Sequence, residues 1–162
     1  MAVKADGNWR SFRHRNYRIL FPANAASNIG TWAQRVAQDW LILQLTDNSG
    51  TYLGLVTAVQ FAPVLFFSLH GGALADRVNK RKLLIATNFI GALSSLGLGL
   101  LVVAGKVQIW HVFFFALTLG ISSALDAPIR QSFTSEIVGH SDIANAVSLN
   151  SANFNAGRLV GP

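Results

Sequence analysis

Polar residues in one otherwise apolar stretch recur at helical spacing and could handle charge inside a membrane. Within residues 19–45 they stand at i, i+4, i+7, i+11, i+14 and i+15, which is one face of a helix: Asn24, Asn28, Thr31, Arg35, Gln38 and Asp39. Charged side chains in a membrane segment mark a functional site by default. Asp39 would exchange a proton or meet a cationic substrate, with Arg35 modulating its charge. A structural pair that only neutralises itself is the alternative.

Asn28 of this polar face is a candidate for the cavity or for coupling, together with Arg35 and Asp39. Hydrogen bonds between helices are the alternative explanation for Asn24 and Asn28. Asp126 and Arg130 stand at i, i+4 near the inner end of another apolar run. They would form an inner gate pair or a plain interface ion pair.

The composition excludes several classes of protein. Of the 162 residues, 51% are hydrophobic and 12% are charged, whereas soluble domains carry roughly 25% charged residues. The absence of Cys excludes a disulfide framework and a thiolate zinc site. The net charge of +6 comes from basic residues that flank apolar runs, which argues against a nucleic-acid partner. No carboxylate pair, His cluster or nucleophile with a base indicates an enzyme, a metal or a cofactor.

The apolar runs predict an all-α integral membrane protein. A helix needs about 20 apolar residues to cross a bilayer, and no run shows the alternation of a barrel strand. We expect a basic cytoplasmic segment at 1–18 and a partial transmembrane bundle at 19–162. The expected spans are 19–45, 53–69, 83–104, 107–125 and an incomplete fifth at 143–162.

The distribution of Lys and Arg predicts the orientation. Five lie in residues 1–18, none in 46–52, four in 77–82 and one in the turn at 105–106. Cytoplasmic loops are enriched in these residues. The pattern places the N-terminus in the cytoplasm, in a multi-pass protein of the cell membrane.

Small residues and prolines in the apolar runs predict where helices touch or bend. Gly91, Ser95 and Gly99 stand four apart and predict a face where another helix approaches closely. Pro63 and Gly120 are candidate bends.

The loop between the second and third expected spans carries the most specific motif. It reads as a glycine, three residues, Asp-Arg, two residues and two basic residues, namely Gly72, Asp76, Arg77, Lys80 and Arg81. This resembles the signature of the major facilitator superfamily, with Asn79 in place of its second glycine. Asn tolerates positive φ, so a tight left-handed turn would survive. A gating role is favoured over a merely topogenic basic loop, because topology does not need the glycine and the aspartate.

A second resemblance follows the fourth run. The segments 126–131, 145–150 and 155–162 are similar to the enterobactin-exporter-like branch of that superfamily. Gly157, Gly161 and Pro162 resemble the beginning of its antiporter motif, which is associated with export. Close packing at the two glycines and a bend at Pro162 would be its physical role.

The resemblance implies a function and a larger architecture. Members of the superfamily have twelve spans in two halves, so we expect four spans and the start of a fifth from an N-terminal fragment whose C-terminal half is missing. The implied activity is proton-coupled export of a small molecule through the lipid bilayer by alternating access. The alternative is a self-contained small oligomeric membrane protein, a channel or scaffold, with Gly91, Ser95 and Gly99 at the subunit interface.

Overall fold

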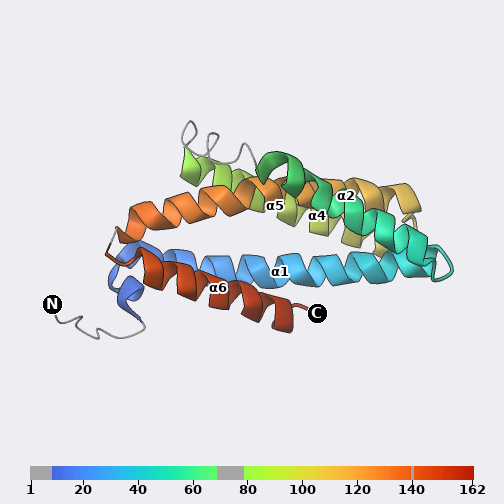
Figure 1. The fold of residues 1–162 in the computed structure, drawn as a ribbon. Helices are drawn as coiled ribbons and strands as arrows, with labels where there is room; N and C mark the ends of the chain where they lie inside the picture. Colours follow the sequence, from blue (N-terminus) through green and yellow to red (C-terminus); the bar gives the residue numbers. More distant parts are fainter. Residues whose placement is uncertain (1–8, 69–78, 140) are drawn as a thin grey trace.

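Helices make up all the regular structure of the described part of the chain. The computed structural model describes residues 9–68, 79–139 and 141–162, which confirms the all-α prediction for these ranges. The elements are η1 (Arg10–Arg13), α1 (Arg15–Leu45), α2 (Gly50–Ser68), α4 (Lys80–Val103), α5 (Ile109–Val138) and α6 (Ile143–Val160) (Figure 1). Helix α5 continues well beyond the apolar run at 107–125 that predicted it.

Local residue types fix the connections between the helices. Asp47 and Asn48 have positive φ values of 49° and 62° in the turn between α1 and α2, a conformation that Asp and Asn adopt more readily than most residues. Gly105 has a φ of 65° between α4 and α5. Asn79 does not form the left-handed turn that we expected. Its φ is −69°, and its side chain accepts a hydrogen bond from the backbone N–H of Lys82 and caps α4.

Helix α5 is the centre of the bundle. It packs against α1, α2, α4 and α6. Figure 1 shows α2, α4 and α5 on one side and α1 and α6 on the other, with α6 beside the first half of α1. The approach of α6 to α1 requires glycine. A Cβ added at Gly157 would lie 2.9 Å from the Cβ of Asn28, and one at Gly161 would lie 2.7 Å from the Cβ of Trp32.

The apolar core of the described residues consists of three clusters. One joins α1, α2 and α5 at one end of the bundle through Ile42, Val56, Val112 and Ala116. Another joins α1, α5 and α6 at the opposite end through Tyr17, Val138 and Ala146. The third joins α4 to α5 through Leu84 and Ile129, and Ile129 is the sequence neighbour of Arg130. Packed side chains therefore hold both ends of the bundle and also fix α4 against α5.

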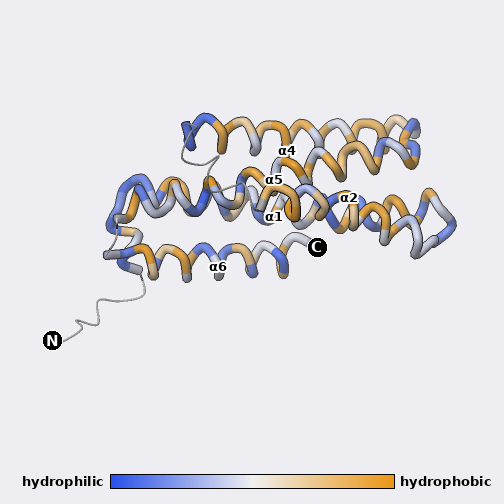
Figure 2. The backbone as a smooth tube through the Cα atoms, turned by 45° about the horizontal axis from the view of Figure 1, so that its top comes forward, coloured by the Kyte–Doolittle hydropathy of each residue, from blue (hydrophilic) through white to orange (hydrophobic). Residues whose placement is uncertain are grey.

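Among the described residues, three helices are long and apolar enough to cross a membrane, namely α2, α4 and α5. Figure 2 shows hydrophobic residues along these helices, whereas α1 and α6 carry many more hydrophilic positions. Large apolar side chains of α4 are exposed, which suits contact with lipid: Ile85, Phe89, Leu93, Leu96 and Leu100. The count of four spans and part of a fifth stays a prediction.

The predicted packing face on α4 is wrong. A Cβ added at Gly91 or Gly99 would meet nothing within 4 Å, whereas one at Gly97 would lie 3.0 Å from the ring of Phe115 on α5. Apart from Ser95, which donates to Gln34 on α1, helix α4 meets its neighbours through another face, whose buried residues are Leu84, Thr87, Ser94 and Leu98. The spacing of small residues did not reveal this face, because the neighbouring helix decides it.

Candidate functional site

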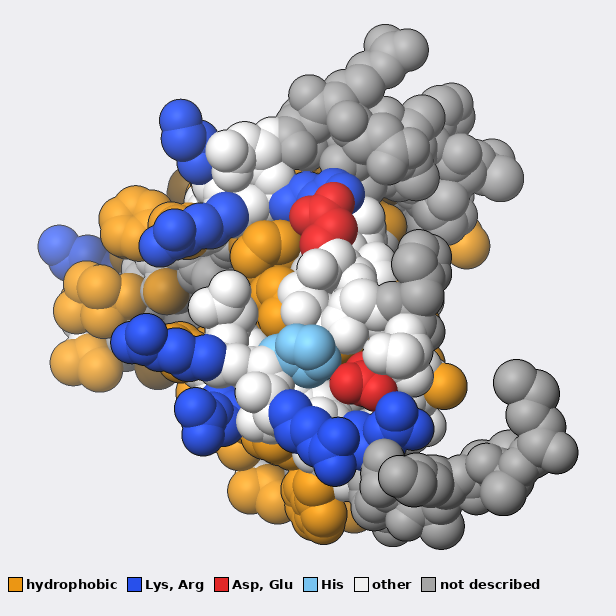
Figure 3. Space-filling view, turned by 90° about the vertical axis from the view of Figure 1, so that its left-hand side faces the viewer, with side chains coloured by type: hydrophobic (Ala, Val, Ile, Leu, Met, Phe, Trp, Pro, Cys, Tyr) orange, Lys and Arg blue, Asp and Glu red, His pale blue; other side chains and the backbone are white. Residues whose placement is uncertain are grey.

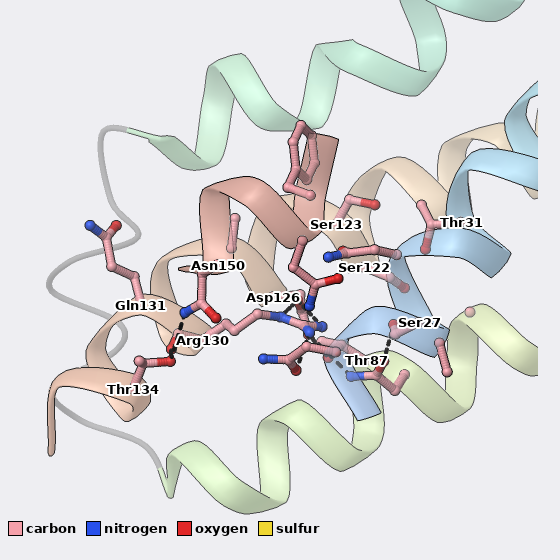
Figure 4. Close-up of a pocket in the computed structure, with 18 of the residues that line it drawn as sticks. Ser27, Thr31, Thr87, Ser122, Ser123, Asp126, Arg130, Gln131, Thr134 and Asn150 are labelled. Atoms are coloured by element: carbon pink, nitrogen blue, oxygen red, sulfur yellow. Dashed lines mark hydrogen bonds and ion pairs between the residues drawn. The ribbon is translucent and has the colours of Figure 1, made fainter. Parts of the chain in front are cut away.

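A cavity of about 1230 Å³ lies between α1, α4, α5 and α6. Figure 4 shows that side chains with hydroxyl, amide and charged groups point into it from these helices. Such groups are rare in lipid-facing positions and line a pathway or a binding site when they converge. Polar lining residues from the four helices include Ser27, Thr31, Thr87, Ser122, Ser123, Asp126, Arg130 and Asn150.

An ion pair between Asp126 and Arg130 belongs to the lining of this cavity. Arg130 donates from Nε to Oδ2 of Asp126 over 2.6 Å, and its second terminal nitrogen lies 2.6 Å from the same oxygen. Both side chains are only 16% exposed. Arg130 also donates to the Oδ1 of Asn24 on α1. Charge-assisted hydrogen bonds of this kind are stronger than neutral ones, so Arg130 binds α5 to α1.

The other carboxylate oxygen of Asp126 binds α4. Thr87 donates to Oδ1 over 3.1 Å and Asn88 over 3.2 Å. Ser27 of α1 in turn donates to the Oδ1 of Asn88 over 2.6 Å. Within the described ranges no group of three or more His, Asp or Glu could hold a metal ion. The network of Asp126, Arg130, Asn24, Ser27, Thr87 and Asn88 thus links three helices through one carboxylate.

Arg35 and Asp39 do not form the ion pair that their spacing indicated. The ion pairs of the described residues do not include them. The guanidinium of Arg35 lies instead 4.9 Å from the ring centre of Trp32 and 5.0 Å from that of Phe61. Arg35 lines the cavity together with Asn28, whereas Asp39 is half-buried outside its lining.

Sequence reasoning missed several polar partners on α2 and α4. Gln60 donates to Gln38 over 3.4 Å, and both side chains are buried. Ser95 donates to Gln34. Together with Thr87 and Asn88, Gln60 and Ser95 are polar residues in the apolar runs at 53–69 and 83–104, for which we predicted no polar contact. Their signal was present in the sequence, because an amide in a charge-free membrane run needs a partner.

The end of the bundle that holds the first turn of α1 and the start of α4 carries most of the basic residues of the described chain. Figure 3 shows Lys and Arg side chains around the acidic groups and a His at this end. Lys80 at the start of α4 forms an ion pair with Glu136 near the end of α5, and Arg81 is exposed. Gly72, Asp76 and Arg77 of the loop motif lie outside the described residues. The structure therefore places only the basic half of that motif.

The segment before α1 is bound to the start of α6. Ser11 donates from its backbone and its hydroxyl to Oδ1 of Asn145, over 3.0 and 2.8 Å. Asp142 lies 3.3 Å from Arg10 and 3.1 Å from His14. The hydroxyl of Tyr17 donates to Asn150 over 3.2 Å, and burial raises the pKa of Tyr17 to about 12, so that it remains a donor. Sequence reasoning predicted only a basic surface segment here.

Comparison with known proteins gives a consistent result. The family model described as "Transmembrane secretion effector" matches residues 6–162. The chain is 30% identical to the "Staphyloferrin A transporter" of Staphylococcus aureus over 146 aligned residues, and this alignment covers 90% of the chain. It is 28% identical over 149 residues to the "Multidrug efflux pump Tap" of Mycolicibacterium fortuitum, covering 89% of this chain. No solved structure matches the chain.

The matched region is a minor part of these relatives. It corresponds to 36% of the length of the Staphylococcus aureus protein and to 36% of the Mycolicibacterium fortuitum protein. The match to the family model, at residues 6–162, includes every helix of the described structure and every residue that lines the cavity.

Proposed function

Since the chain belongs to the transmembrane secretion effector family of major facilitator transporters, we propose that this protein exports a small molecule across the cell membrane by alternating access. The observation that carries the proposal is the polar cavity between α1, α4, α5 and α6, in a bundle with packed apolar clusters at its two ends. A cavity of this kind holds a substrate while the rest of the bundle faces lipid. The likeness to the enterobactin-exporter-like branch and the motif at Gly157, Gly161 and Pro162 support export as the direction.

Asp126 and Arg130 form the inner gate pair in this proposal. Opening the cavity toward the cytoplasm separates α1 and α4 from α5, and the two residues bind all three helices. The charges of Asp126 and Arg130 are shielded from water, so each side chain needs a new hydrogen-bond partner when the helices move apart. The gate thus has two discrete arrangements rather than a continuous range, as alternating access requires.

Arg35, Asp39 and Asn28 form the coupling region, and a proton is the coupling ion. Asp39 is the titratable acid closest in sequence to the cavity-lining Arg35 on α1. The loop motif of Gly72, Asp76, Arg77, Lys80 and Arg81 controls the movement between bundle halves. The Lys80–Glu136 ion pair supports this role, because it transmits a movement of the loop to α5.

The test follows the access of the cavity from the two sides of the membrane. The described chain has no cysteine, so Ser95→Cys in the full-length protein, without other cysteines, places one reactive thiol in the cavity. We expect an impermeant maleimide to label it from either side, with the two rates changing in opposite directions when a pH gradient is imposed. In the Asp39→Asn variant, the pH gradient should no longer change the two labelling rates.

The outcomes separate a transporter from its rivals. Rates that rise or fall together from both sides would indicate a channel and overturn alternating access. Labelling from one side only, whatever the gradient, would indicate a static scaffold. Labelling of Lys106→Cys, which is exposed in the turn before α5, controls for reagent access because it should not respond to the gradient.

A further inference from the structure

Arg35 is a cation of the cavity lining that no acceptor of the described chain contacts directly, although Asp39 one turn further along α1 is close enough to interact with its charge. Arg35 forms no hydrogen bond or ion pair within the described ranges, and its Nε is buried without a hydrogen-bond partner. Arg130 differs, because its guanidinium is bound to Asp126 and Asn24. The rings of Trp32 and Phe61 compensate part of the lost hydration of this guanidinium, but they accept no conventional hydrogen bond. Arg35 is therefore the charged group of the described lining with donor capacity for a ligand, and the buried amide nitrogens of Asn24 and Gln34 also lack an acceptor.

The surroundings of Arg35 increase the positive potential at the same place. The exposed guanidinium of Arg158 on α6 lies 5.6 Å from the ring centre of Trp32, the ring that Arg35 also contacts. Phe154 meets Trp32 edge to face at 5.6 Å between ring centres. Two cations beside one indole repel each other, and an anion placed near them lowers this repulsion. The aromatic rings offer an apolar surface next to the charge.

The charges of the lining exclude a cation as the preferred ligand. Among the described lining residues, Arg35 and Arg130 are positive and Asp126 is negative. The one carboxylate already accepts hydrogen bonds from Arg130, Thr87 and Asn88. The remaining polar lining consists of hydroxyls and amides, which can donate to oxygen atoms. A cationic ligand would find no free acceptor of opposite charge here, whereas an anion would find a free donor fork.

We propose that the substrate is an organic oxyanion with an apolar or aromatic body, whose carboxylate or sulfonate binds the guanidinium of Arg35. The body of the molecule packs against Trp32 and Phe154, which both line the cavity. The planar fork of arginine matches two oxygen atoms of such a group. This inference rests on the proposed transport function, because it names the class of molecule that the same cavity accepts.

The experiment compares three probes that share one body and differ in charge. They are naphthalene-1-sulfonate, naphthalene-1-sulfonamide and (1-naphthylmethyl)trimethylammonium, and calorimetry measures their binding to the full-length protein in nanodiscs. We expect the anion to bind most tightly. Arg35→Gln should weaken the binding of the anion about tenfold, as expected for loss of a charge-assisted pair. It should leave the affinity for the neutral probe unchanged. Arg35→Lys should recover part of the loss, because it keeps the charge without the fork. Arg18→Gln, which removes an exposed arginine of the same helix, is the matched control. This variant should bind all three probes with the affinities of the wild type.

Each other result overturns the inference. Tighter binding of the cation, or equal or absent binding of all three probes, would exclude an anion site of this type. An anion preference that survives Arg35→Gln would assign the site to another group, with Arg35 held by a part of the protein outside the described residues. The access measurements with Ser95→Cys do not depend on any probe. Alternating access together with a failed anion preference would thus overturn the substrate class and leave the proposed function standing, whereas loss of alternating access would remove both.

Discussion

Asp126 accepts hydrogen bonds on both of its oxygens, from Arg130 on one and from Thr87 and Asn88 on the other. At the scale of the residue, this carboxylate compensates a cation and binds a neighbouring helix at the same time. Both side chains of the ion pair are largely shielded from solvent. Removing one partner from such a pair costs far more than the pair as a whole contributes, because the other charge remains without compensation.

A double-mutant cycle tests this interpretation. Asp126→Asn leaves Arg130 charged and without its counter-ion, and we expect the free energy of unfolding to fall by about 3 kcal/mol. Arg130→Gln should give a similar loss. The double variant should be more stable than the sum of the two losses indicates, by about 1–3 kcal/mol. Denaturant unfolding of the full-length protein in detergent measures all four values. Strictly additive losses would show that the two charges do not interact.

The two i, i+4 pairs show how far spacing alone predicts a contact. Asp126 and Arg130 form an ion pair at the spacing that suggested one. The same spacing predicted a pair between Arg35 and Asp39, but Arg35 lies over the rings of Trp32 and Phe61. Phe61 comes from α2, which the sequence of α1 cannot indicate. The local rule therefore fails where a residue of another helix competes for the side chain.

At the scale of the element, the length and the contacts of α5 differ from expectation. The apolar run ended near Leu125, whereas the helix continues through Pro128 to Val138. The apolar run ends at the charged residues Asp126 and Arg130. The helix continues through them because their side chains have hydrogen-bond partners on α4 and α1. Gly120 was a candidate bend. Its role in the structure is a close approach to α2, because an added Cβ would collide with the backbone carbonyl of Gln60 and lie 3.2 Å from Pro63.

A matched pair of glycine substitutions separates contact from helix propensity. Gly120→Ala should lower the free energy of unfolding by about 1–3 kcal/mol, because the methyl group meets backbone that cannot move freely. Gly99→Ala adds the same methyl group to α4, where nothing lies within 4 Å. It should be neutral or stabilising by up to about 1 kcal/mol, since Ala favours a helix over Gly. Equal effects of the two substitutions in denaturant unfolding would exclude the α2–α5 contact as the cause.

At the scale of the whole molecule, apolar clusters hold the two ends and polar groups line the cavity between α1, α4, α5 and α6. Composition and charge distribution predicted a helical membrane bundle, because these properties are averages over many residues, whereas the family was predicted from the resemblance of the loop motif at Gly72, Asp76 and Arg77. Composition and charge did not predict which helix faces meet, as Gly91 and Gly99 show, where an added Cβ would meet nothing within 4 Å. They also did not predict that Ser11 and Tyr17 bind α6, since this contact joins the two ends of the described chain.

The orientation of the bundle is a prediction at this scale. Basic residues gather at the end that holds the first turn of α1 and the start of α4, and cytoplasmic ends are rich in such residues. In the full-length protein without other cysteines, Lys106→Cys should react with an impermeant maleimide added outside intact cells. Arg13→Cys should react only after the cells are opened. Both positions are exposed, so reaction of Arg13→Cys in intact cells would reverse the proposed topology.

The bond between Ser11 and Asn145 has a consequence for the synthesis of the protein. The two residues are 134 positions apart, and chains are made from the N-terminus at about 5–20 residues per second. Roughly 7 to 27 s therefore pass between the synthesis of Ser11 and the synthesis of Asn145, its binding partner. For the first part of that interval the polar face of α1, with Arg35 and Asp39, has neither α4 nor α6 beside it, and α6 is still missing after α4 has been made. We expect the insertion machinery to keep this helix in a polar environment until the later helices are made.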